Sequence, residues 1–253
     1  GVLFNAVTAY DSLVTNYGDQ FRGEIMLDSV DNILITSCSR SNNFPVQNAF
    51  QSTKASGQDG VVFKLSNDFS SMIFSSFYGG NNEDACYSVK IDSSNNIVFA
   101  GGTSSDNLSG LNTGLFSSYQ GGKSDGFVVK LLPDASSITN GSYIGQALYD
   151  QVFFVEIDRN DNVFLLGQSR GGTFPITPGV YSNGSSSNFI IKLNPSLDAN
   201  IASTRFGNGS SDIHISPSAF LVDVCGNVYV SGWGANILQG TPLSGMPVTP
   251  NTA

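Results

Sequence analysis

Glutamate, histidine and tryptophan are nearly absent from this sequence of 253 residues. It has three glutamates, one histidine and one tryptophan, against 28 glycines. The shortage of glutamate removes a strong helix former, and the abundance of glycine favours turns over helix interiors. A single histidine also argues against the histidine-rich metal sites of many hydrolases. The composition therefore predicts short strands joined by tight turns.

Cysteine is scarce as well, and long apolar runs are missing. Cys38, Cys86 and Cys225 lie far apart without a CxxC spacing, so the sequence indicates neither a zinc cage nor a dense disulfide framework. One bridge at most could form, and which of the three would pair stays open. No segment approaches the ~20 apolar residues of a membrane span, which argues against direct membrane insertion.

Basic residues are few. Charged residues make up 12% of the chain and hydrophobic residues 40%, the balance of a folded domain, while the net charge is −9. A surface of this sign repels a phosphate backbone, so nucleic acid is not expected as a partner.

What the sequence does contain is a repeat. The segments LDSVDNILIT, IDSSNNIVFA, IDRNDNVFLL and VDVCGNVYVS recur at intervals of 64, 66 and 65 residues. Each holds an aspartate, a polar turn, an asparagine and an alternating apolar run. The turn residues are Asp28, Asn32, Asp92, Asn96, Asp158, Asn162, Asp223 and Asn227. Repeats of this length indicate an array of identical structural units.

Further landmarks keep the same spacing. The segment DGVVFKL at 59–65 returns as DGFVVKL at 125–131 and as SNFIIKL at 187–193, and an aromatic or apolar residue with a glycine closes each unit. Each unit thus has four stretches of strand character. The approximate units are 1–18 (partial), 19–80, 81–145, 146–207 and 208–253 (partial). We predict one all-β domain over 1–253, a β-propeller of about four repeats that is either a closed four-bladed ring or part of a larger ring.

The segments VDVCGNVYVSGWG, IDSSNNIVFAGGTSS and DGFVVKL resemble the bacterial SBBP β-propeller repeat over essentially the whole chain. They are also similar to propeller regions of large surface proteins from gliding, Bacteroidota-type bacteria, which are cargo of type IX secretion. The resemblance implies an extracellular or cell-surface location and a role in adhesion. The chain departs from it where Ser187 replaces the aspartate of DGFVVKL.

The acidic residues could form two kinds of site, a calcium site or a catalytic site. Turn aspartates such as Asp158 offer oxygen ligands for calcium, but without the spacing of an EF-hand loop, and hairpin hydrogen bonding explains them more simply. We therefore predict no cofactor, with calcium as the alternative. Paired carboxylates for glycoside hydrolysis are not singled out, and His214 beside Ser211 and Asp212 does not make a triad, because neighbours on a strand point to opposite faces. No catalytic or metal-ligating residue is predicted.

Trp233 is the remaining candidate for binding. It stands where the other units have Cys38, Gly102 and Gln168, so it interrupts the repeat. It could fill a gap beside a neighbouring sheet or stack on a sugar ring. Our leading interpretation is a non-enzymatic extracellular propeller that serves as a scaffold or recognition surface. Its expected partners are other domains of the same large surface protein, or a protein or glycan ligand. The alternative is a propeller glycosidase or lyase, or a lectin-like carbohydrate binder.

Overall fold

The computed structural model describes residues 23–236, 241–242 and 244–248. These residues form strands, turns and loops, and no helix occurs among them, which confirms the all-β prediction. The partial repeat unit predicted at 1–18 lies outside the described residues. Within them, no helix has the length and apolar character that crossing a membrane requires.

Three four-stranded antiparallel sheets follow one another along the chain, each with its strands paired in chain order. A fourth sheet has two described strands, and a short two-stranded ribbon follows it. The first sheet contains β1 (Glu24–Leu27), β2 (Ile33–Ser39), β3 (Asp59–Leu65) and β4 (Met72–Tyr78). The second contains β5 (Asp84–Ile91), β6 (Ile97–Thr103), β7 (Asp125–Leu131) and β8 (Ile138–Ile144). The third contains β9 (Asp150–Ile157), β10 (Val163–Ser169), β11 (Asn188–Leu193) and β12 (Asn200–Phe206). The fourth contains β13 (Ser216–Val222) and β14 (Val228–Trp233), and the ribbon β15 (Ala235–Asn236) and β16 (Thr241–Pro242).

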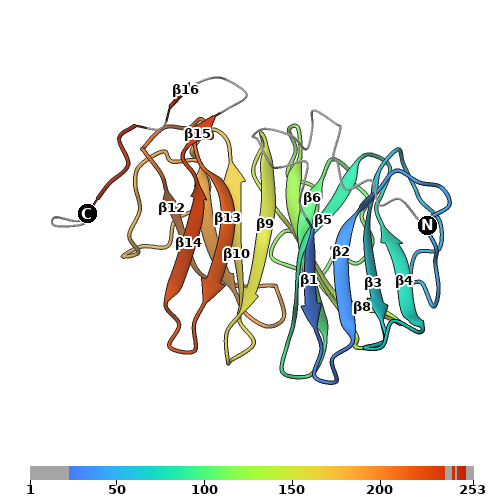
Figure 1. The fold of residues 1–253 in the computed structure, drawn as a ribbon. Coiled ribbons are helices and arrows are strands. Elements are labelled where there is room, and N and C mark those ends of the chain that lie inside the picture. The colour runs from blue at the N-terminus through green and yellow to red at the C-terminus, as the bar shows by residue number, and fades with distance from the viewer. Residues whose placement is uncertain (1–22, 237–240, 243, 249–253) are drawn as a thin grey trace.

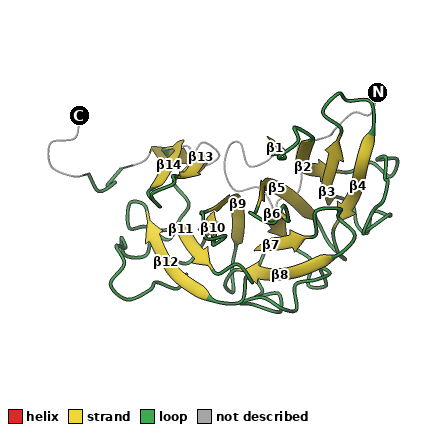
Figure 2. Ribbon diagram, turned by 90° about the horizontal axis from the view of Figure 1, so that it is seen from below, coloured by secondary structure: helices red, strands yellow, loops and turns green. Residues whose placement is uncertain are grey.

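The four sheets stand side by side in chain order (Figure 1). Seen along the other axis, they fan out along an arc, with the first strands β1, β5, β9 and β13 on its inner side and β8 and β12 on its outer rim (Figure 2). The first and fourth sheets form the two ends of this arc. No strand pairing joins these ends among the described residues, so they do not form a closed ring.

Each sheet packs its faces on its neighbours. We call the face toward the preceding sheet the upstream face and the face toward the following sheet the downstream face. Between the first and second sheets, the ring of Tyr78 meets those of Phe99 and Phe127 at centroid distances of 5.2 Å. Between the second and third, Val98 and Val128 pack with Val155 in one buried cluster. The core therefore lies in the layers between sheets, which explains why the strands are apolar on both faces.

A β-bulge interrupts the first strand of the second, third and fourth sheets at the same repeat position. The pairing of β5 with β6 skips Tyr87, so Gly101 lies opposite Cys86 and Ala100 opposite Ser88. A Cβ on Gly101 would lie 1.9 Å from the carbonyl oxygen of Ala85. Gly167 and Gly232 hold the same place at the other two bulges. The repeated glycine is thus a consequence of the bulge, where backbones approach too closely for a side chain.

Candidate functional site

The predicted turn residues form one hydrogen-bonded unit in all four sheets. In the second sheet, Oδ1 of Asp92 accepts hydrogen bonds from the backbone N–H groups of Ser94 and Asn96, both at 2.9 Å, and the Asn96 amide donates to Oδ2 at 2.9 Å. The residue before the asparagine is left-handed: Asn95 has φ 65°. The same bonds occur at Asp28, Asp158 and Asp223, where the left-handed position is held by Asp31, Asp161 and Gly226. Aspartate and asparagine are used here for local backbone bonding.

A lysine from the third strand of the sheet completes three of these turns. Lys130 lies 3.1 Å from Asp92 with both side chains almost fully buried, and Lys64 and Lys192 contact Asp28 and Asp158 in the same way. Burial pushes the pKa of Asp158 upward, but hydrogen bonds from Lys192, Asn162 and the backbone outweigh it and hold that pKa at about 2. The lysine of the repeated DGFVVKL segment is therefore the counterion of the repeated turn aspartate.

The turns meet at one end of the inner strands. Ser93 donates to Asp161 from its backbone N–H at 2.9 Å, which joins the second sheet to the third. Asp92, Asp158 and Asp223 line a common hollow of about 340 Å³ with Arg159. Among the residues described, no group of three His, Cys, Asp or Glu side chains is arranged to hold a metal ion. The prediction of no cofactor, with calcium as its alternative, stays untested.

Sequence reasoning missed a charged cluster on the first strands of three sheets, formed by Glu24, Ser88, Lys90 and Glu156. The Lys90 ammonium hydrogen-bonds to Glu24 and lies 3.5 Å from Glu156. Ser88 donates to Glu24 at 2.5 Å and accepts from the backbone N–H of Val155 at 3.0 Å. Two of the three glutamates in the chain thus converge on one lysine, and the cluster joins β1, β5 and β9.

The cluster is mostly but not fully buried. Burial raises the pKa of Glu156 against the opposing effect of Lys90, and the charge of Glu24 raises it further. Two carboxyl groups in different environments are the arrangement from which an acid and a base can be built. A buried ion network that holds adjacent strands together needs the same contacts. The geometry supports both roles.

A signal for this cluster was present in the sequence. Lys90 and Glu156 stand two residues before the turn aspartate, where the first and fourth units have Met26 and Leu221. A charged side chain at a position that is apolar in the other units indicates that this residue does more than pack against a neighbouring sheet. The small number of glutamates in the chain gives no sign of the cluster, but the charged residues at these two repeat positions do.

Buried carboxyl groups form a second set, at the opposite ends of the strands. Asp84 begins β5 and accepts hydrogen bonds from the Gly80 N–H at 2.7 Å, from Ser105 at 2.9 Å and from Thr103. Burial raises its pKa to about 8, and it raises the pKa values of Asp125 and Asp150 to about 7. These groups are internal to the sheet junctions, so we assign them to folding stability rather than to a binding site.

The structure places Trp233 at the end of β14 with 58% of its surface exposed. Trp233 belongs to the fourth sheet, whereas the Glu24–Lys90–Glu156 cluster lies on β1, β5 and β9 of the first three sheets. His214 lies in the loop before β13. Cys38 and Cys86 are buried and Cys225 is exposed, and none of the three forms a disulfide with another described residue.

In comparisons with known proteins, no family model and no curated protein matches the chain. The likeness to the SBBP repeat therefore stays a prediction that rests on the residues of the repeat.

Proposed function

We propose that the four sheets are blades of a β-propeller and that the chain is a non-enzymatic, extracellular scaffold or recognition module of a large secreted or cell-surface protein. One observation carries this proposal: the repeated polar side chains form their hydrogen bonds and ion pairs within their own sheet. The turn aspartates bond to their own backbone and to an asparagine and a lysine of the same sheet. Side chains that hold a strand meander in shape are what a scaffold requires.

The order of strands supports the propeller. Every complete sheet is a four-stranded meander, the sheets pack face to face, and their first strands lie together on the inner side of the arc (Figure 2). This is the arrangement of propeller blades around an axis. An experimental structure in which the first strands of successive sheets do not share an axis would overturn this part of the proposal.

The location is tested by fractionation of the source cells. We expect the protein at the cell surface or in the medium, where added protease removes it from intact cells. A protein that is protected in intact cells and recovered with the cytosol would contradict the surface assignment.

A second candidate function is hydrolysis or elimination on a polysaccharide, and the Glu24–Lys90–Glu156 cluster favours it. The cluster places two carboxyl groups beside the inner strands, as a central-channel glycosidase or lyase would need. The test is a turnover screen over polysaccharides with Glu156→Gln and, as the matched control, Glu83→Gln, the glutamate that lies outside the cluster. Turnover that is lost in the first variant and kept in the second would favour the enzyme.

A carbohydrate-binding role is favoured only by the exposure of Trp233. A glycan array with the wild type, Trp233→Ala and the control Tyr181→Ala tests it, because Tyr181 is similarly exposed in the loop between β10 and β11. Equal binding by all three proteins would remove the support for stacking on Trp233.

A further inference from the structure

Two of the three cysteines face each other across the junction of the first and second sheets. Cys38 lies near the end of β2 and Cys86 lies in β5, and both are buried. Leu34, four residues before Cys38, shares its face of β2 and packs in the same buried cluster as Cys86. Cys38 in turn packs with Ala85 and Tyr87, the two chain neighbours of Cys86. The two thiols therefore lie between the downstream face of the first sheet and the upstream face of the second.

The position of Gly60 shows how closely the two cysteines approach. Gly60 pairs directly with Cys38 across the ladder of β2 and β3. Partners in an antiparallel ladder have Cα atoms about 4.5–5.5 Å apart and side chains on the same face. A Cβ on Gly60 would lie 2.3 Å from the Sγ atom of Cys86. The sulfur of Cys86 thus occupies the space of the missing Gly60 side chain, beside that of Cys38. This is the close facing position that a disulfide requires, because it links Cα atoms only about 4.4–6.8 Å apart.

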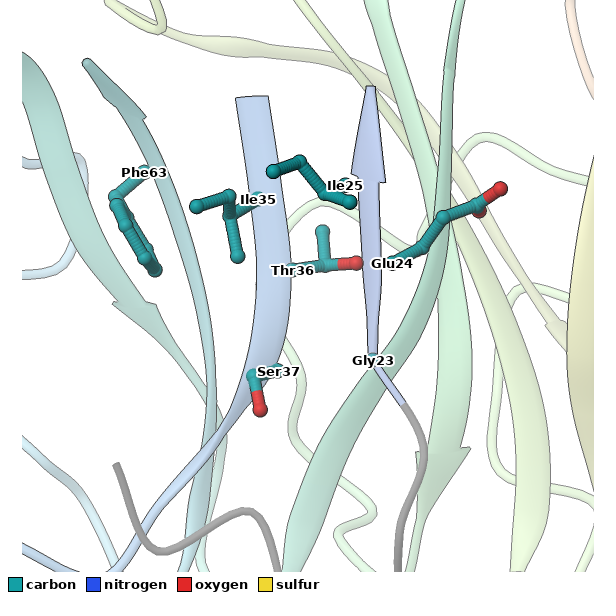
Figure 3. A pocket seen from close by; sticks show the side chains of 7 residues that line it. All are labelled: Gly23, Glu24, Ile25, Ile35, Thr36, Ser37 and Phe63. Atoms are coloured by element: carbon teal, nitrogen blue, oxygen red, sulfur yellow. The ribbon is translucent and has the colours of Figure 1, made fainter. Parts of the chain in front are cut away.

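Hydrogen bonds hold the junction together on both sides of Cys86. Two residues before it, the backbone N–H of Asp84 donates to the carbonyl of Gln58 at 2.9 Å, just ahead of β3. Two residues after it, Ser88 donates to the carboxylate of Glu24, which points from β1 toward β5 (Figure 3). The strands that carry the two cysteines are therefore fixed relative to each other, and a bridge between the thiols needs no rearrangement of the sheets.

Among the described sheet junctions, the cysteine pair occurs at one only. The corresponding positions hold Gly102 and Val152 between the second and third sheets, and Gln168 and Pro217 between the third and fourth. Packing of one sheet on the next therefore requires cysteine at neither position. Two of the three cysteines in the chain nevertheless occupy both positions of the same junction, which indicates that they act as a pair.

We propose that Cys38 and Cys86 are a disulfide site that links the first sheet to the second when the chain folds in contact with a disulfide oxidant such as oxidised glutathione. One thiolate attacks the oxidant and forms a mixed disulfide, and the other thiolate then displaces glutathione from it. The two cysteines lose two protons and two electrons, and the oxidant takes these up as two glutathione thiols. The inference concerns the sheet junction and is independent of the proposed scaffold or recognition role.

Burial determines when the bridge forms. Burial raises the pKa of the Cys86 thiol, and the nearby Asp84 and Cys38 raise it further. Thiolates are the reacting species in disulfide exchange, so the folded site should exchange slowly. The bridge should therefore form during folding, before β5 packs on the first sheet, and then resist reduction. Cys225 is exposed in the turn between β13 and β14 and should stay a thiol.

Refolding from urea in a buffer of oxidised and reduced glutathione tests the proposal. Trypsin cleaves after lysine and arginine, which places the three cysteines on separate peptides, 23–40, 65–90 and 206–253. We expect mass spectrometry without reductant to detect 23–40 linked to 65–90, and one thiol per chain, that of Cys225, to titrate in denaturant. Three thiols per chain, or a link that involves 206–253 instead, would overturn the assignment.

Two variants distinguish the bridge from packing. Cys86→Val copies Val152 of the third sheet and removes the bridge, whereas Cys225→Ser is the control that keeps it. Reduction should lower the melting temperature of the wild type and the control by at least about 5 °C, because the bridge constrains the unfolded chain, and should leave that of Cys86→Val unchanged. Far-UV circular dichroism verifies that all proteins keep their strands. An oxidised wild type that melts no later than the reduced one would mean that the bridge strains the junction, and the proposal would be wrong.

Discussion

The buried carboxyl group of Asp84 should make the protein less stable as the pH rises, and Asp84→Asn should remove that effect. Asp84 is fully buried at the start of β5, where burial raises its pKa from 3.8 to about 8. Between these values the folded state keeps a proton that the unfolded state has released. The free energy of unfolding therefore falls as the pH rises from about 4 to about 8, and it is constant above that range with respect to this group.

The size of the effect follows from the shift. At 1.36 kcal/mol per pH unit, the difference between the two pKa values, 3.8 and about 8, corresponds to at most about 6 kcal/mol. Asparagine suits the site because its oxygen can accept from Gly80 and Ser105 while its amide donates to the hydroxyl of Thr103, which contacts the other carboxylate oxygen in the wild type. At pH 8 the free energy of unfolding of the variant should therefore be at least that of the wild type. At pH 4 the wild type should gain stability relative to the variant.

The assay is urea denaturation followed by far-UV circular dichroism at pH values from 4 to 9. Asp125 and Asp150 titrate in the same direction, so the informative quantity is the difference in unfolding free energy between Asp84→Asn and the wild type at each pH. The control is Asp134→Asn, an exposed turn carboxylate whose curve should run parallel to that of the wild type over this range. A difference for Asp84→Asn that changes by less than about 1 kcal/mol between pH 4 and 8 would refute a buried, protonated Asp84.

The lysine that pairs with the turn aspartate and the glycine at the bulge can be tested by single substitutions. Lys130→Met should destabilise the fold by about 3 kcal/mol, because it leaves Asp92 buried without its counterion. Lys192→Met should destabilise it less, because Lys192 is more exposed. Thermal unfolding of both variants measures the difference. Equal losses would argue against burial as the cause. Gly101→Ala should destabilise by several kcal/mol because its Cβ meets the Ala85 carbonyl, whereas Ser37→Ala at the same repeat position should be mild. A mild Gly101→Ala variant would contradict the close backbone approach at the bulge.

The strands could be predicted from the sequence because the signals of a strand lie within the strand itself and in the turns beside it. The segments DGVVFKL and DGFVVKL are predicted and observed strands, β3 and β7, since alternation, β-branched residues and flanking turn residues all agree. The packing of one sheet on the next also follows from the repeat, because apolar residues on both strand faces need two partners.

The bulges and the charged cluster were harder to predict. A bulge changes the pairing register without changing the composition of the strand, so Tyr87 and Phe153 have the sequence pattern of ordinary strand residues. In the structure each is the extra residue at a bulge, and the centroids of their two rings lie 5.5 Å apart. The cluster depends on residues 132 positions apart, Glu24 and Glu156, that only the stacking of three inner strands brings together. The bulge leaves only a repeated glycine, and the cluster is visible only when equivalent positions of the repeat are compared, so neither feature can be predicted from one segment alone.

The charged cluster is the part of the inner strands that the repeat does not need, and this can be tested by restoring the residues of the other units. Lys90→Met and Glu156→Leu copy the residues found at the same positions in the first and fourth sheets, Met26 and Leu221, and Glu24→Gln removes the remaining charge but keeps an oxygen that can accept from Ser88 and the Val89 N–H. Replacing a buried ion network by uncharged residues of similar size is often neutral or stabilising, whereas removing one member leaves unpaired charge.

We therefore expect the triple variant to unfold at least as late as the wild type, and Lys90→Met alone to lose about 3 kcal/mol because two carboxylates then face each other. Thermal and urea unfolding of both proteins measure this. A triple variant that is less stable than Lys90→Met would make the network part of the folding requirement, like the lysine of the Asp92 turn. A stable triple variant would instead leave the charges to be explained by what the protein binds or converts, because the fold itself would not require them.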